Sequence, residues 1–244
     1  MPRTPAAFSS SRVPRRVRLS LLVLAALLAS GCAGSRRADR ARNPVVFVHG
    51  WSSSPAAWAT MTERFRADGW PDAYLVAWEY DSRRSNAETA ARLAGRIDTL
   101  LAETGARRVD VVSHSMGALP TRYYARELDG ARRIDAWVSL GGPSHGTVTA
   151  YTCFSAACRE MRPGSAFLRA LNDGDETPGG PRYATWRSPC DLVVVPQDSP
   201  ALDGATNHVT ACLLHLDLPE NAGVYAQVRD WLAANEAGSA EATW

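Results

Sequence analysis

The sequence predicts an α/β fold in which a mostly parallel sheet is flanked by helices on both faces. Three observations predict it. Short apolar runs alternate with stretches of helical periodicity, the first run is apolar without interruption, and neither internal repeats nor a domain-splitting linker is found. The length of 244 residues, 45% of them hydrophobic, fits one large domain or two small ones. Because no domain-splitting linker is found, a single domain is favoured.

Val45–His49 is the first predicted strand, because it is a continuous apolar run, as in strands buried on both faces, and it ends in His-Gly. Proteins with open parallel sheets bind their ligands at the carboxyl ends of the strands, so the residues that follow each strand are candidate functional residues. Further strands are expected at Ala73–Trp78, Arg108–Val112, Ile134–Leu140 and Asp191–Val195.

Asn86–Glu103 is the most regular predicted helix, because its apolar residues recur at the helical period along one face. That face carries Ala90, Leu93, Ile97, Leu100 and Leu101. Further helices are expected at Pro55–Asp68, Met116–Leu128 and Val224–Ala234.

The charge composition excludes two classes of protein. The chain has 27 Lys plus Arg against 25 Asp plus Glu, a formal net charge of +2. Nucleic-acid binders usually carry a strong basic excess, and disordered chains combine few apolar residues with a larger net charge. We therefore expect a folded protein with no nucleic-acid partner, and we expect it to be a monomer.

Residues 1–31 have the organisation of an export signal. The basic segment Arg12–Arg18 precedes the apolar run Leu19–Ala29, and small residues follow. The run is shorter than the roughly 20 apolar residues of a membrane-spanning helix. The protein is therefore expected to be exported, and to be extracellular or membrane-anchored.

Leu28–Cys32 resembles a bacterial lipobox, in which the cysteine is lipidated and becomes the first residue of the mature chain. A lipidated Cys32 would attach the protein to a membrane, and ordinary cleavage nearby with free secretion is the alternative. Residues 32–43 are polar and are expected to form a flexible tether, followed by the folded domain at residues 44–244.

Ser115 lies where a predicted strand runs into a predicted helix, and the small residues Ser113 and Gly117 stand two positions away on either side. So sharp a turn holds its central residue at positive φ with an exposed side chain, and bulky neighbours would collide with the backbone. An ordinary turn with a capping serine is the alternative. The context favours a nucleophile, with the backbone N–H groups of Met116 and Trp51 as oxyanion donors.

A serine nucleophile needs a positioned base, and four histidines are candidates. His49 is expected to orient the loop after the first strand, and the side chain of His114 is expected to point away across the turn. His208 fits a strand or a turn equally well. His215 lies in a loop-like apolar stretch just before the last helix, and it is the base that we expect.

Asp191, Asp198 and Asp203 are the candidates for the acid, which in this architecture lies between the serine and the histidine in sequence. Asp191 opens an apolar run, whereas the other two fall in a loop rich in turn-forming residues. We expect His215 to take the proton of Ser115 and Asp191 to hold the imidazole in the required tautomer.

Four of the five cysteines follow the export signal and its lipobox, and an even number in an exported chain points to disulfides. We favour the pairs Cys153–Cys158 and Cys190–Cys212, the second of which would clamp the loops of the acid and the base. A zinc site is the alternative, but the chain has no Cys-x-x-Cys pair. We expect neither a metal nor a cofactor.

Taken together, the motifs resemble the α/β-hydrolase superfamily and, more narrowly, the bacterial class 2 triacylglycerol lipases, over about residues 44 to 234. Two positions depart from that family, since Ser113 replaces its usual Gly or Ala and Ala118–Pro120 replaces a Gly-rich helix start. The segments that carry the resemblance are Val45–Trp51, Val111–Gly117, Ser139–Thr147, Asp191 with its apolar run, Leu202–Ala205 and His215–Leu216.

The resemblance implies the hydrolase fold, the roles given above to Ser115, Asp191, His215, Trp51 and Met116, and acyl-ester lipids as substrates. The function expected is a secreted serine carboxyl-ester hydrolase, a triacylglycerol lipase or esterase that forms an acyl-enzyme. An acyltransferase with the same intermediate is one alternative. A catalytically dead surface binding protein is another, which the presence of all three triad residues disfavours.

The segment between Ile134–Leu140 and Asp191 is too short for a cap domain with a core of its own, and we expect the Cys153–Cys158 pair to pin it. A small or absent lid and an open apolar cleft are therefore expected. Candidates for the lining of the cleft are Trp51, Met116, Leu119, Phe154, Phe167 and Leu214.

Overall fold

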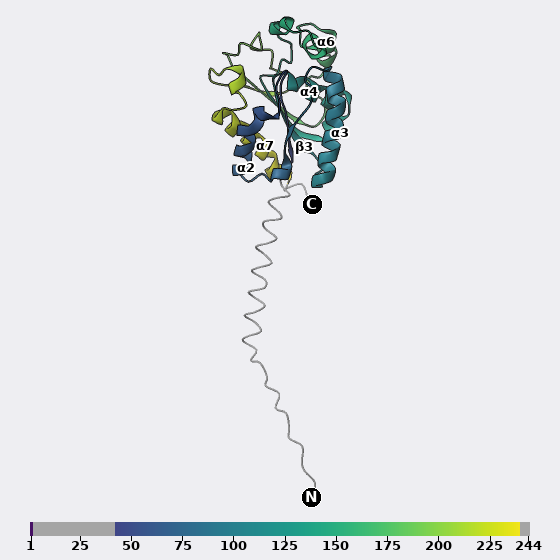
Figure 1. Ribbon diagram of the computed structural model, residues 1–244, viewed down its shortest axis with the longest axis vertical. Coiled ribbons are helices and arrows are strands. Elements are labelled where there is room, and N and C mark those ends of the chain that lie inside the picture. The colour runs from purple at the N-terminus through teal and green to yellow at the C-terminus, as the bar shows by residue number, and fades with distance from the viewer. Residues whose placement is uncertain (2–41, 240–244) are drawn as a thin grey trace. The chain divides into compact units, whose positions relative to one another are not determined.

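Six parallel strands form the sheet, in the spatial order β2-β1-β3-β4-β5-β6 (Figure 1). The structure is a computed structural model that describes Met1 and residues 42–239, with side chains up to residue 234. The strands are β1 (Val45–Val48), β2 (Leu75–Trp78), β3 (Val109–His114), β4 (Ile134–Leu140), β5 (Arg182–Arg187) and β6 (Thr206–Val209).

The helices cover both faces of the sheet (Figure 1). The helices α2 (Ala59–Ala67) and α7 (Ala222–Ser239) lie on one face, and α3 (Asn86–Thr104) and α4 (Ala118–Glu127) lie on the other. Two short helices, α5 (Ala156–Glu160) and α6 (Ala166–Leu171), contribute to the core beside α3 and α4.

Strand β1 shows how one apolar run serves two cores. Successive side chains of a strand point to opposite faces, so Val46 and Val48 pack with α3 and α4 while Val45 and Phe47 pack with α2 and α7. All four are fully buried. This accounts for the uninterrupted apolar sequence and confirms the predicted mostly parallel sheet flanked by helices.

The strand order places a topological switch point between β1 and β3. The chain continues from β1 to its outer neighbour β2, and from β3 outward in the other direction to β4. The loops after β1 and β3 therefore diverge and leave a crevice at the carboxyl ends of the strands. The expected residue Trp51 lies three positions after the end of β1, and the expected residue Ser115 directly follows β3.

The strand predicted at Asp191–Val195 is wrong. These residues form bends and turns, because Asp191 Oδ1 accepts hydrogen bonds from the backbone N–H groups of Val193 and Val194, at 2.8 and 2.9 Å. A carboxylate that bonds the backbone two and three residues ahead closes a turn and competes with a sheet ladder. The strand next to β4 is instead β5 (Arg182–Arg187), which the sequence analysis did not anticipate.

No cap domain interrupts the described part of the chain. The segment between β4 and Asp191 holds the 3-10 turn η5 (Val148–Thr152), the short helices α5 and α6, and β5. The predicted export signal and tether lie outside the described residues, apart from Met1 and residues 42–43. Within the described residues, no helix has the length and apolar character needed to cross a bilayer.

Candidate active site

Ser115 occupies a sharp turn between β3 and α4, as the first residue of the 3-10 turn η3 (Ser115–Gly117), with a φ of 54°. Such left-handed backbone is rare for a residue with a side chain and is found where the surrounding structure enforces it. The residue two positions after Ser115 must be small, since a Cβ on Gly117 would lie 2.4 Å from the Val48 carbonyl oxygen. Ser113, two positions before Ser115, is fully buried, and its hydroxyl donates to the Val138 carbonyl at 2.8 Å.

His215 and Asp191 form a buried hydrogen-bonded pair, with His215 Nδ1 2.7 Å from Asp191 Oδ2. Burial by itself would raise the pKa of Asp191, but the hydrogen bond and charge of His215, with the backbone N–H groups of Val194 and Val193, outweigh it and hold that pKa below its ordinary value. Asp191 is therefore ionised at neutral pH. The pair fixes the tautomer of the imidazole, because Nδ1 must carry the proton that it donates.

Ser115 and His215 line one cavity of about 510 Å³. His215 Nε2 has no hydrogen-bond partner among the described residues. The structure thus brings Asp191 and His215 into direct contact and places Ser115 on the lining of the same cavity as His215, without a hydrogen bond between Ser115 and His215.

The loop after β1 comes unusually close to the serine. A Cβ on Gly50 would lie 2.8 Å from Ser115 Cβ, so this approach is open to glycine alone. The backbone N–H of Trp51, the next residue, has no acceptor in the described part of the chain. The N–H of Met116 belongs to the first turn of a helix, where N–H groups lack intrahelical acceptors.

His49 and Tyr80 hold this loop in place. His49 Nδ1 lies 2.9 Å from the Gly50 carbonyl oxygen, and the Tyr80 hydroxyl donates to the His49 carbonyl. The two rings stack with their centroids 4.3 Å apart. Burial lowers the pKa of His49, which keeps it neutral. Nothing in the local sequence pointed to Tyr80, because it lies two residues beyond β2 and far from the motif.

The expectation that His114 points away from the site is wrong. Its Nε2 lies 3.0 Å from the backbone carbonyl oxygen of His215, and the two rings are 4.6 Å apart. Burial, with a smaller contribution from the neighbouring His215, lowers the pKa of His114 to about 3. The ring is therefore neutral, and its Nε2–H donates to the carbonyl. The contact spans 101 positions and has no local sequence signal.

The sulfur atoms of the four described cysteines lie at disulfide distance in the two favoured pairs, Cys153–Cys158 at 2.00 Å and Cys190–Cys212 at 2.08 Å. The second pair joins the segments that carry the Asp191–His215 pair. Ser188 reinforces this junction, because its hydroxyl donates to the Leu213 carbonyl at 2.7 Å and accepts from the Leu213 N–H at 3.0 Å.

Of the expected lining residues, Trp51 borders the cavity. Met116 and Leu119 are instead fully buried in the core, and Phe167 stacks on Tyr123. Phe154 and Leu214 are exposed, outside the cavity itself. Apolar atoms dominate the lining, which includes Ala57, Pro143, Ala150, Met161, Val193, Val194 and Leu216.

The other candidate acids and base lie elsewhere. His208 stacks on Trp186 at 4.3 Å, on the outer strands of the sheet. Asp198 and Asp203 border a separate, more polar pocket together with His145. No group of three or more side chains suited to a metal ion occurs within the part of the chain that the structure describes.

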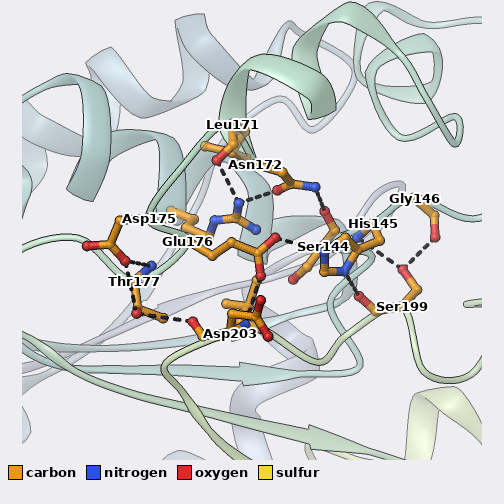
Figure 2. A network of polar contacts seen from close by, with 12 residues as sticks. Ser144, His145, Gly146, Leu171, Asn172, Asp175, Glu176, Thr177, Ser199 and Asp203 are labelled. Carbon is orange, nitrogen blue, oxygen red and sulfur yellow. Dashed lines mark hydrogen bonds and ion pairs between the residues drawn. The ribbon is translucent and has the colours of Figure 1, made fainter.

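A second polar network fixes the loop after β4 (Figure 2). His145 Nε2 lies 2.8 Å from Glu176 Oε1, and its Nδ1 lies 3.1 Å from the Ser199 carbonyl oxygen. The other carboxylate oxygen of Glu176 accepts from the Asp203 N–H at 2.8 Å. The network joins three loops, and the loop of His145 runs on into Thr147, which lines the cavity.

Comparisons with known proteins agree with this architecture. The family model "Lipase (class 2)" matches residues 42–210. The mature form of Bacillus licheniformis lipase BlEst2 superposes with a TM-score of 0.69 at 18% identity, over 79% of this chain and 92% of that one. Aspergillus fumigatus lipase B gives a TM-score of 0.69 at 20% identity, over 79% of this chain and 52% of that one, so the present chain spans about half its length.

A monoacylglycerol lipase from Paleococcus ferrophilus is also similar, with a TM-score of 0.58 at 13% identity over 79% of this chain and 96% of that one. Identities this low show a shared fold. The family match covers most of the chain. The parallel sheet, the turn at Ser115 and the family match together show that the chain belongs to the class 2 lipase family of lipolytic hydrolases.

Proposed function

We propose that the protein is a serine carboxyl-ester hydrolase, a triacylglycerol lipase or esterase, with Ser115, His215 and Asp191 as its catalytic residues. The observation that carries the proposal is the 2.7 Å hydrogen bond between Asp191 and His215, together with a serine that is held at a φ of 54° and lines the same cavity as His215. A serine hydroxyl becomes a nucleophile when an oriented base can take its proton.

In the proposed reaction, His215 Nε2 takes the proton of Ser115 Oγ as that oxygen attacks the carbonyl carbon of the ester. The backbone N–H groups of Trp51 and Met116 stabilise the oxyanion. His215 then protonates the departing alcohol, which leaves an acyl group on Ser115. Water, deprotonated by the same nitrogen, releases the acid and restores the serine. Asp191 stays ionised and stabilises the imidazolium in both halves.

The lining supports an acyl chain as the group that the cavity binds, because most of its surface is apolar and offers dispersion contacts. No cofactor takes part in the proposed steps. We also propose that the protein is a monomer that acts outside the cytoplasm, either attached to a membrane through lipidated Cys32 or freely secreted. The N-terminal sequence supports the export.

The Ser115→Ala variant tests the proposed function. With a soluble p-nitrophenyl ester, we expect kcat/KM to fall by at least about a thousandfold, because removing one triad member disables the whole relay. Ser54→Ala is the matched control, since Ser54 is exposed and its side chain makes no capping hydrogen bond. Full activity in Ser115→Ala would refute the assignment.

A further inference from the structure

His145 is placed so that both of its ring nitrogens face hydrogen-bond acceptors. Nε2 lies 2.8 Å from a carboxylate oxygen of Glu176, and Nδ1 lies 3.1 Å from the backbone carbonyl oxygen of Ser199 (Figure 2). An ionised carboxylate and a backbone carbonyl can only accept. A neutral imidazole has one N–H and satisfies one of these acceptors, whereas an imidazolium donates to both. The arrangement therefore fits the charged form of the ring.

Glu176 is held as an anion by its other neighbours. Its second carboxylate oxygen accepts from the Asp203 N–H at 2.8 Å, and its charge acts on the buried guanidinium of Arg122 in α4. Burial lowers the pKa of Arg122 to about 10, and the charge of Glu176 is the largest effect that opposes burial. Protonating Glu176 would leave this guanidinium buried without its counter-charge. The proton between Glu176 and His145 thus belongs to His145.

Charged side chains approach this network from several segments, but one of them contacts the His145 ring. Among the described residues, that contact is the ion pair with Glu176. Arg126 and Arg169 donate to backbone carbonyls. Neutralising His145 therefore acts through a single ion pair. The surrounding charged residues are Arg122 and Arg126 of α4, Arg169 of α6, Asp173 and Asp175 after α6, and Asp198 and Asp203 of the loop that follows Asp191.

The bond from Nδ1 belongs to a small clasp between two loops. The backbone N–H of His145 also donates to the Ser199 carbonyl, at 3.2 Å. The Ser199 hydroxyl is buried and donates to the Gly146 carbonyl at 2.6 Å. His145 and Gly146 belong to the loop after β4, and Ser199 belongs to the loop that begins at Asp191. The clasp therefore closes one loop onto the other.

The two clasped loops form one wall of the cavity. Thr147 Oγ1 donates to the Val193 carbonyl at 2.8 Å and accepts from the Val195 N–H at 3.0 Å. Thr147, Val193 and Val194 line the cavity. His145 itself lies outside the lining, on a neighbouring polar pocket. It can therefore set the spacing of this wall without contacting the substrate.

Asp191, at the other end of the second loop, has separate supports. Its carboxylate bonds His215 and two backbone N–H groups of its own loop. The neighbouring Cys190 lies at disulfide distance from Cys212. Loss of the contacts of His145 should therefore change the cavity wall more than the proposed acid, and substrate binding more than turnover.

We propose that His145 is a positioning residue for the proposed reaction, which in its doubly protonated form clasps the loop after β4 to the loop after Asp191 and so fixes the wall against which the acyl group binds. The inference rests on the proposed function and adds how acyl binding at the same site is regulated. When the ring loses a proton, one of its two bonds is lost. Acyl binding should then weaken as the pH rises.

The KM of a soluble ester measured across pH tests the proposal. Histidine ordinarily changes its charge between about pH 5 and 8. For p-nitrophenyl hexanoate and wild type, we expect KM to rise about fivefold from about pH 6 to about pH 8, the scale of one lost hydrogen bond. Over the same range kcat should rise, because the base His215 must be neutral to take a proton. The opposite directions separate the two histidines.

His145→Gln removes the charge and leaves one donor. At about pH 6 we expect its KM to exceed that of wild type about fivefold, with kcat within about twofold, and at about pH 8 the two proteins should have the same KM. With p-nitrophenyl acetate, whose acyl group is too short to span the wall, KM should match at both pH values. His208→Gln is the matched control, since His208 lies on β6 outside the cavity lining and the clasp.

Nitrogen-15 NMR of wild type labelled at histidine reports the protonation of each ring directly and needs no variant to fold. The chain has five histidines. We expect His145 to carry two ring protons at about pH 6 and one at about pH 8. His114 is the internal reference, because burial lowers its pKa to about 3 and it should carry one ring proton at both pH values.

Several outcomes would overturn the proposal. A single ring proton on His145 at pH 6 would do so. A KM raised equally at pH 6 and pH 8 in His145→Gln would show a structural role without the charge, and equal changes with both esters would show general disruption. Failure of the proposed function is distinguishable, because it appears as hydrolysis that persists in Ser115→Ala, whereas the NMR measurement involves no reaction.

Discussion

His215 is held at two places, and together they limit where its Nε2 can lie. Asp191 accepts from the ring at 2.7 Å, while His114 donates to the backbone carbonyl of the same residue at 3.0 Å. Proton transfer requires heavy atoms within hydrogen-bond reach, and a misplacement of about 1 Å can cost about a hundredfold in rate. His114 therefore acts as a positioning residue for the proposed base.

Replacing His114 should lower turnover without weakening substrate binding. In His114→Phe the ring is kept and the donor is lost, so we predict a fall in kcat of about tenfold with KM little changed. His114→Gln, whose amide can donate from a similar place, should recover part of the loss. Steady-state kinetics with a soluble ester measure both parameters. An equal loss in the two variants, with KM raised, would indicate general disruption instead.

At this scale the sequence predicted some residues and missed others for a physical reason. Ser115 stands in a local strand–turn–helix context, and Asp191 and His215 could be ranked by their neighbours along the chain. The orientation of His114 and the support given by Tyr80 depend on contacts between distant segments. The prediction that Met116 and Leu119 line the cavity was wrong for the same reason, because both side chains are buried in the core.

Among the elements, the pairing of β3 with β4 is irregular at Asp110, whose side chain accepts a backbone hydrogen bond from β4. The register shifts between Val109 and Val111, and Asp110 Oδ1 accepts from the Ala136 N–H at 3.1 Å. Burial, followed by repulsion from Asp135, raises the pKa of Asp110 to about 8. The carboxyl group is therefore protonated in the folded protein at neutral pH, whereas in the unfolded chain it is ionised.

This carboxyl group should make stability depend on pH. Its folded pKa is raised, so its contribution is complete below about pH 4, the ordinary pKa of aspartate, and is lost as the pH rises through about 8. Asp110→Asn keeps an acceptor for Ala136 and removes the titration. We predict a flatter dependence of Tm between pH 4 and 8 in the variant, and a higher Tm than wild type at pH 8. Thermal melts of wild type and variant across this pH range measure the two dependences. Curves of Tm against pH that run parallel in the two proteins would contradict the prediction.

Element boundaries followed the sequence where periodicity was strong. β4 has the predicted bounds Ile134–Leu140, and the apolar face of α3 is buried as expected. The strand at Asp191–Val195 failed because the apolar run there is closed into a turn by its own carboxylate. β5 was not predicted because Arg182 and Arg187 stand at its two ends and Thr185 interrupts the apolar run between them, although the sheet buries its four central residues.

On the scale of the whole molecule, the folded unit and the proposed export signal occupy separate parts of the sequence. The compact unit begins at Arg42, whereas Cys32, the proposed lipidation site, lies before it in the sequence. Attachment and catalysis should therefore be independent.

Cys32→Ser should release the protein without inactivating it. In a bacterial host, we predict that wild type fractionates with membranes and carries a lipid-modified N-terminus by mass spectrometry, while the variant is found in the soluble exported fraction. Hydrolysis of a soluble ester per mole should match, because Cys32 precedes the folded unit. Finding both proteins soluble, with the same unmodified N-terminus, would favour free secretion.

The hydroxyl of Ser113 has a consequence for how such enzymes are recognised. Its side chain is buried and turned toward β4, where the Val138 carbonyl accepts its proton. A serine therefore fits at this position, and the turn at Ser115 does not require glycine there. A search pattern that demands glycine on both flanks of the nucleophile would pass over this chain, and one that asks for a small residue before it and glycine after it would not.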